Sequence, residues 1–207
     1  MNLRSSFVIT IMLISLSFFV VQHIEKNISW TTLMSDVRVA ERLNEIDSWK
    51  YYGAKGYPSN DLGSMVSQTN YERAAWGQVA LKFIKEMPQG YGLVLESFGH
   101  RARELWPDSK LLQSHSGWLD LTLGIGIPGI LLIGLAGLLG LKNAVQVNDG
   151  FWPHISLWIL SSIALLMITT EVSQKTYIDA LTFLILWPSA MGLVPGSSIS
   201  SNSKFRK

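Results

Sequence analysis

Long apolar segments with almost no charged residues are the feature that most constrains this 207-residue chain. There are four of them, at residues 5–21, 121–141, 155–170 and 177–194. A helix needs about 20 mostly apolar residues to cross a bilayer, and the second segment carries no charged side chain over 21 positions. The fourth contains Asp179 and Pro188 but is otherwise apolar. The segments predict an all-α, polytopic membrane protein with about four transmembrane helices.

The first apolar segment fits either an anchor helix or a signal peptide. A cleavable signal ends in small residues, whereas Gln22, His23, Ile24 and Glu25 follow here. We therefore expect an uncleaved transmembrane helix at residues 1–22.

Basic residues in the short connections predict the orientation of these helices, because Lys and Arg resist translocation. One side would hold Arg4, Lys142, Lys204, Arg206 and Lys207, and the other only Lys175. The first side is thus expected to be cytoplasmic. Residues 23–117 would form a large helical extracytoplasmic loop, residues 118–196 three transmembrane helices, and residues 197–207 a cytoplasmic tail.

Composition excludes several classes of function. Only 15% of the residues are charged and the net charge is +2, which provides no long basic face for nucleic acid. The chain has no Cys, so disulfides, zinc–thiolate sites and thiol nucleophiles are excluded. The spacing of His23, His100 and His154 does not suggest a metal site.

Two helices are predicted within the loop. The first is amphipathic, with its apolar side chains at helical spacing: Leu33, Val37, Ala40, Leu43 and Ile46. Residues 51–68 are rich in Gly, Pro, Ser and Asn and read as a connection. The second helix would be capped by Asn70 and stopped by Pro88 and Gly90. Its buried side would contain Ala74, Ala75, Val79, Phe83, Ile84 and Met87.

Arg73 is the first candidate for chemistry. It is predicted in the opening turn of the second helix, where unpaired N–H groups and the helix dipole favour an anion. A guanidinium there would bind phosphate through two hydrogen bonds. The alternative is an ion pair with Glu72, Glu104 or another carboxylate of the loop.

His115 is the second candidate, two residues before Gly117 and the predicted membrane helix. An imidazole titrates near neutral pH, so its neutral form can accept a proton from a hydroxyl. The alternative is a structural His at the membrane surface. Asp120, about one helical turn further on, would either orient His115 or cap the helix.

Two further features have a chemical and a structural interpretation. Arg101 and Arg103 would bind a phosphate or an anionic headgroup, or form surface ion pairs with Glu96, Glu104 and Asp108. The glycine-rich residues 124–129 match a nucleotide-loop spacing, but such a loop follows a strand and lies in water. We expect the small residues here to let helices pack closely, and Pro128 to bend the helix.

Together these residues resemble the C-terminal part of the O-antigen ligase and polymerase superfamily. In that family the large periplasmic loop ends in His followed by Asn, Ser or Gln, then nine residues, then Gly-x-x-Gly. His115-Ser116, residues 117–125 and Gly126-x-x-Gly129 fit this pattern without a gap. Arg73-Ala74-Ala75-Trp76 is similar to the Arg-containing helix of that loop, and Gly90-Tyr91-Gly92 to the turn after it.

The resemblance implies a glycosyltransferase of the bacterial inner membrane with its large loop in the periplasm. It would transfer a glycan from undecaprenyl diphosphate to a lipid A–core hydroxyl as a ligase, or to another carrier-linked glycan as a polymerase. The reaction inverts the anomeric carbon and uses no metal or other cofactor. His115 would be the base and Arg73 would hold the diphosphate, with Arg101 and Arg103 as weaker candidates for the same role.

The number of helices departs from the family pattern, because members have many more spans than the four predicted here. The absent N-terminal spans normally build much of the lipid-carrier cavity and contribute another functional Arg. The chain is thus expected to be a C-terminal portion of the enzyme, and an N-terminal companion chain is one predicted partner. The alternative is an inactive truncated protein.

Overall fold

The computed structural model describes residues 3–92, 96–146, 151–169, 179–180, 183–187 and 190. Within these ranges every regular element is helical, which confirms the predicted all-α class. The chain divides into two compact units, Met1–Ala75 and the residues from Trp76 onward. The boundary falls inside one helix, α3 (Gln68–Glu86).

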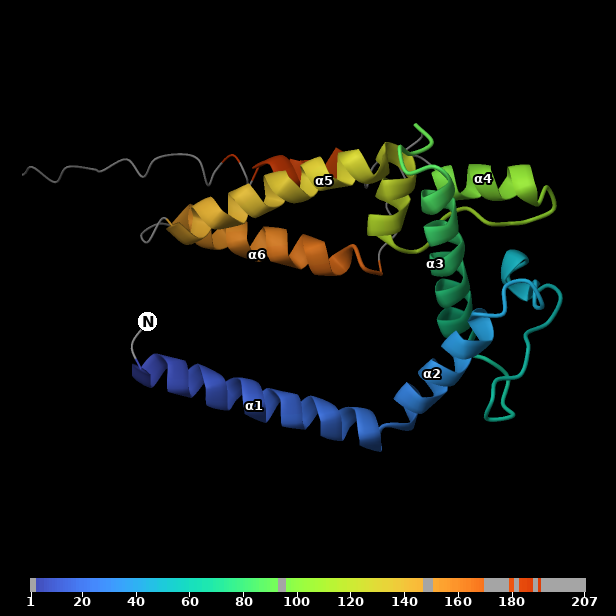
Figure 1. Cartoon of the computed structure of the whole chain (residues 1–207), viewed down its shortest axis with the longest axis horizontal. Helices are drawn as coiled ribbons and strands as arrows, with labels where there is room; N and C mark the ends of the chain where they lie inside the picture. The colour runs from blue at the N-terminus through green and yellow to red at the C-terminus, as the bar shows by residue number, and fades with distance from the viewer. Residues whose placement is uncertain are drawn as a thin grey trace, which may run out of the picture. The chain divides into compact units, whose positions relative to one another are not determined.

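The first unit begins with α1 (Leu3–Lys26) and α2 (Ile28–Ala40), which meet at a bend of 72° (Figure 1). Asn27 lies at the bend in an extended conformation, and its Oδ1 accepts the N–H of Ser29, 3.0 Å away. Such an N-cap satisfies one of the donors that a helix start leaves unpaired. The predicted first helix therefore forms, and a second one starts immediately after it.

Large apolar side chains are exposed around α1, including Phe7, Ile14 and Phe19, each more than half accessible. Apolar side chains exposed on a helix suit a lipid environment. By length and composition, Thr10–Lys26 and Ile28–Ala40 pass as a membrane segment only together, as a broken span or a re-entrant pair.

The buried face of α2 differs from the predicted one. The helix ends at Ala40, so Leu43 and Ile46 lie beyond it, and the buried residues are Ser35, Asp36, Val39 and Ala40. Helical spacing of apolar residues predicted that the apolar side chains would face inward. In the folded chain two polar side chains take the inner positions because a loop supplies their hydrogen-bond partners.

That loop connects α2 to α3 and contains the short helix η1 (Ser48–Lys50). Buried Asp36 accepts hydrogen bonds from Asn60 Nδ2 at 2.9 Å, Asn70 Nδ2 at 3.0 Å and the Ser67 N–H at 3.2 Å. A buried carboxylate is tolerated when such bonds replace its hydration. The predicted connection at residues 51–68 is therefore an irregular but ordered loop.

The predicted second helix is α3, with corrections at both ends. It begins at Gln68, so Asn70 is not its cap and instead donates to Asp36. Ala75, Val79, Phe83 and Ile84 are buried as predicted. Ala74 is only half-buried, and Met87, just past the end of the helix, is 45% exposed. Pro88 follows as the predicted stop.

In the second unit, aromatic side chains connect α4 (Ser97–Leu105) to the later part of α3. Phe83 of α3 is fully buried, with its ring centroid 5.9 Å from Phe98 and 6.1 Å from Trp106. The Gly99 N–H donates to Leu112 O, which ties α4 to the segment that leads into α5.

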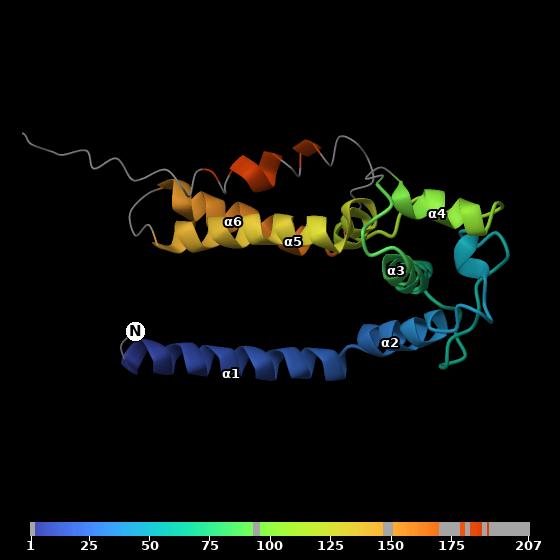
Figure 2. The same cartoon turned by 45° about the horizontal axis from the view of Figure 1, so that its top comes forward.

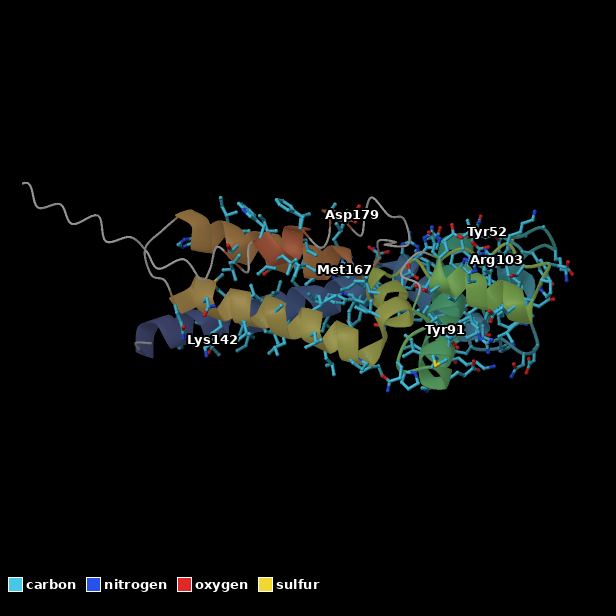
Figure 3. All side chains as sticks on the ribbon, turned by 90° about the horizontal axis from the view of Figure 1, so that it is seen from above. Tyr52, Tyr91, Arg103, Lys142, Met167 and Asp179 are labelled. Atoms are coloured by element: carbon cyan, nitrogen blue, oxygen red, sulfur yellow. The ribbon has the colours of Figure 1, made fainter. Side chains whose placement is uncertain are left out.

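Two apolar helices complete the second unit, α5 (Gly117–Gln146) and α6 (Phe151–Leu166). They lie side by side and antiparallel (Figures 1 and 2). Leu121, Ile163, Met167 and Ile185 form the buried cluster at their contact. Figure 3 shows Lys142 at the end of α5 remote from Tyr91 and Arg103.

Of the described helices, α5 alone is individually long and apolar enough to cross a membrane, over Gly117–Asn143. The apolar part of α6, His154–Leu166, is shorter than a span. In the predicted fourth helix the structure describes residues 179–180, 183–187 and 190, all helical. The rest of residues 177–194, Lys175, and the tail with Lys204, Arg206 and Lys207 lie outside the described residues.

Candidate functional site

His115 lies in a tight turn immediately before α5. Its backbone φ of 59° is in the left-handed region. Residues other than Gly adopt this region only where their surroundings require it. Ser114 Oγ donates to Ser116 O at 3.2 Å and accepts the Ser116 N–H at 3.3 Å. The two serines thus close the turn around His115.

Asp120 secures this turn from within α5. Its carboxylate is 4% exposed, and Oδ1 accepts the Ser114 N–H at 3.0 Å. The Asp120 N–H donates to Ser116 O, as in the first turn of a helix. The bond ties the Asp120 carboxylate to the backbone of the residue just before His115.

Trp76 of α3 stacks on the imidazole of His115. The ring centroids are 4.9 Å apart and the ring planes differ by 18°. Trp76 is 2% exposed, whereas His115 is half-buried. One face of the imidazole therefore rests on a fixed indole while the rest of the side chain stays within reach of solvent or a ligand.

Arg73 lies on the same helix, three residues before Trp76. Because α3 starts at Gln68, Arg73 is past the opening turn where it was predicted, and the effect of the helix dipole fades over that distance. Its side chain is exposed. Among the described residues no carboxylate is within ion-pair distance of Arg73, so the predicted pairs with Glu72 or Glu104 do not form there.

Arg101 is held by carboxylates. Its Nη1 donates to Glu104 at 2.9 Å, and its Nη2 to Glu86 at 3.4 Å. The hydrogen bond to Glu104 raises the pKa of the Arg101 guanidinium. The guanidinium also lies 5.9 Å from the Phe83 ring centroid. These contacts agree with the surface ion pair rather than with an open phosphate site.

Arg103 has similar partners, Glu96 at 3.5 Å and the carbonyl of Leu111 at 3.4 Å. The nearby Tyr91 hydroxyl donates to Phe83 O, and burial raises the pKa of this phenol. This cluster fixes α4 and the turn after α3.

The two predicted glycine motifs meet in the structure. Gly126 interrupts α5 with φ 74° and ψ 175°, and Gly90 follows α3 with φ 84°. A Cβ on Gly126 would lie 2.3 Å from the Gln89 carbonyl, and one on Gly90 would lie 2.4 Å from the Gly126 nitrogen. Only glycine fits at either position. We call this contact the glycine interlock.

Backbone hydrogen bonds hold the interlock. The Tyr91 N–H donates to Leu123 O at 2.7 Å, the Gly92 N–H to Gly124 O at 3.0 Å, and the Ile127 N–H to Pro88 O at 2.8 Å. These bonds satisfy groups that the break in α5 would leave unpaired. The predicted bend at Pro128 is thus a break at Gly126, at the point where the turn after α3 contacts α5.

Two glycines further along α5, Gly134 and Gly137, make no such close contact in the described part of the chain. A Cβ on Gly134 or Gly137 would meet no heavy atom within 4 Å in the described part of the chain. Both line an apolar cavity beside α6. Gly129 packs differently, because a Cβ there would meet the Ile125 side chain at 2.7 Å.

Sequence reasoning missed two residues that organise these regions. Trp76 was recognised only as part of the Arg73 segment, and no spacing rule pairs it with a His in a distant turn. Helical spacing did not single out Asp36, which is buried. The one available signal was the Asn- and Ser-rich loop that provides its partners.

The described residues contain no group of three or more His, Asp or Glu placed to hold a metal ion. The chemically useful groups are the imidazole of His115, the exposed guanidinium of Arg73 and the glycine interlock near the start of α5. No family model, characterised protein or solved structure matches the chain.

Proposed function

We propose that the chain is part of a membrane glycosyltransferase of the O-antigen ligase type. It would transfer a glycan from undecaprenyl diphosphate to a sugar hydroxyl of lipid A–core. One observation carries the proposal: the half-buried imidazole of His115 is fixed against Trp76, at the start of a helix long and apolar enough to cross a membrane. A proton acceptor in this position serves a reaction between a membrane-bound donor and acceptor.

In the proposed step, neutral His115 accepts the proton of the acceptor hydroxyl. The hydroxyl oxygen attacks the anomeric carbon, a new glycosidic bond forms, and the bond from that carbon to the diphosphate oxygen breaks. Undecaprenyl diphosphate leaves with the electron pair, and the configuration at carbon inverts. The imidazolium then returns its proton to water.

Arg73 is proposed to stabilise the departing diphosphate. Its guanidinium is exposed and, within the described part of the chain, has no carboxylate partner. A cation fixed near a leaving group that gains charge lowers the barrier to transfer. Arg101 and Arg103 already hold carboxylates, so we place them second for this role.

The proposal includes the finer membrane topology. The chain would have four spans in the inner membrane of a bacterium, with residues 23–117 in the periplasm and both ends in the cytoplasm. The apolar surfaces of α1 and α5 support contact with membrane lipid. The remaining wall of the lipid-carrier cavity would come from an N-terminal companion segment.

The proposal is tested by introducing His115→Ala in the cells that make the chain. Their lipopolysaccharide is then analysed by gel electrophoresis. We expect complete loss of glycan transfer with an unchanged amount of chain in the membrane fraction. The matched control is His100→Ala, because His100 is exposed on α4 and is expected to leave the ladder unchanged. Transfer that persists in His115→Ala, or a wild type without transfer, would contradict the proposal.

The same gels distinguish the two acceptors. A ligase defect removes every glycan from lipid A–core, whereas a polymerase defect leaves core with a single repeat. If the chain belongs to a ligase, His115→Ala should leave lipid A–core without any glycan. Core with a single repeat would instead indicate a polymerase.

A further inference from the structure

We infer that Trp76 is the positioning residue of His115, presenting its imidazole at the start of α5. The inference rests on the proposed function, because it assigns Trp76 a role in the proton transfer by His115. Trp76 does not touch the reacting atoms. It acts by limiting the orientations of the imidazole through the stack.

The stack provides what a positioning contact needs. The nearly parallel rings, 4.9 Å apart, leave the imidazole little freedom to rotate away from the indole. The indole is itself 2% exposed and lies on a helix of 19 residues, so its own position is fixed. The indole face therefore limits the orientations open to the imidazole.

Two contacts hold the first part of α5, one near Trp76 and one at Gly126. Leu119 lies against α3, 3.9 Å from the position of a Cβ on Gly77, the residue after Trp76. The glycine interlock fixes the other end of this segment, at Gly126. The backbone that carries His115 thus stays in place when Trp76 is changed, and the main loss is the orientation of the ring.

Positioning also explains why the partner is aromatic and not a hydrogen-bonding side chain. A face-to-face contact leaves the ring nitrogens in the plane of the imidazole, where hydrogen bonds are made. The stack itself therefore does not occupy the atoms that a proton acceptor needs. Since small displacements of a reacting group lower rates by up to about 100-fold, loss of the stack is expected to reduce kcat.

The stack has a spectroscopic signature that does not depend on activity. The full chain, labelled at histidine Cε1 and purified in nanodiscs, has four His signals, and His115→Gln identifies one of them. The indole ring current should move the Hε1 resonance of His115 upfield of its position in a chain that lacks the Trp76 ring. Trp76→Leu should abolish this displacement and Trp76→Phe should retain part of it. Trp158→Leu, at an exposed Trp of α6, is the matched control and should leave it unchanged.

Transfer is measured on membrane vesicles with undecaprenyl-diphosphate-linked glycan and increasing lipid A–core. We expect Trp76→Leu to lower kcat about 10- to 100-fold with little change in KM, and Trp76→Phe to restore most of it. If Trp76→Leu fails to fold, the smaller displacement and smaller kcat loss in Trp76→Phe still test the inference.

The possible failures are distinguishable. An Hε1 resonance that does not move in the Trp76 variants overturns the stack, whatever the transfer rate. A resonance that moves while kcat stays constant overturns the positioning role and leaves His115 as the base. Transfer that survives His115→Ala overturns the proposed function itself.

Discussion

The two units of the chain are stabilised by different kinds of contact. In the first, side chains converge on buried Asp36, which accepts hydrogen bonds from the loop and from α3. In the second, backbone groups meet at Gly90 and Gly126, and three main-chain hydrogen bonds fix the turn against α5. The first arrangement depends on the carboxylate of Asp36, and the second depends on the absence of a side chain at Gly90 and Gly126.

The difference determines how each unit tolerates substitution. A side-chain network fails when an acceptor is removed, because its buried donors lose their partners. A close backbone contact fails when an atom is added, because backbone cannot move aside as a flexible side chain can. Substitutions of both kinds test the comparison.

The largest effect is expected for Gly126→Ala. The new Cβ would overlap the Gln89 carbonyl, and Ala also disfavours the φ of 74° at this position. We expect the second unit to lose about 4 kcal/mol of stability, measured by urea-dependent proteolysis in detergent. The control is Gly134→Ala on the same helix, which should gain about 0.5–1 kcal/mol. Equal effects of the two substitutions would show that the interlock does not hold this unit.

A smaller loss is expected for Asp36→Asn in the first unit. The amide keeps one acceptor oxygen but places an NH₂ group against the donors of Ser67 and Asn70. We expect the stability to fall by about 2–3 kcal/mol, again by proteolysis. Asp61→Asn is the control, since Asp61 is 38% exposed and its ion pairs with Arg38 and Arg42 contribute at most about 1 kcal/mol. A loss no larger than in the control would remove Asp36 from its central role.

Alkaline pH should weaken the first unit to a smaller extent. Burial, and the hydrogen bond from its hydroxyl to Glu72 at 2.7 Å, raise the pKa of Tyr57 above its ordinary value near 10. Above pH 10 the unfolded chain releases this proton before the folded chain does, so stability present at lower pH is lost as pH rises. Unfolding measured at pH 9, 10 and 11 should show a shallower decline in Tyr57→Phe than in the wild type. Identical slopes would contradict the assignment.

Much of the fold was predictable because apolar runs and stop residues act locally. The helical class, the apolar helices α1, α5 and α6, and the buried face of α3 around Val79 and Phe83 follow from residue spacing. The break at Gly126 did not, because Pro128 is the stronger local signal and the true cause is a turn from another part of the chain. The inward face of α2 was missed for a similar reason.

For the candidate site, the sequence identified the residue types but not their neighbours. Residue type and spacing are enough to point to His115, Arg73 and the glycines of both motifs. That Gly90 meets Gly126, and that Trp76 supports His115, depends on how α3 packs beside the start of α5. The ion pairs of Arg101 and Arg103 were one of two interpretations of the sequence, and the distances favour them.

The sequence alone thus established which segments are apolar helices and where an imidazole and a guanidinium occur along the chain. This is because hydrophobic spacing and helix ends depend on residues that are close in the sequence. Tertiary structure decided which polar groups are buried, where α5 breaks and what the imidazole rests on. Each of these depends on atoms from segments far apart in the chain, whose contacts form only when backbone and side-chain hydrogen bonds are satisfied together.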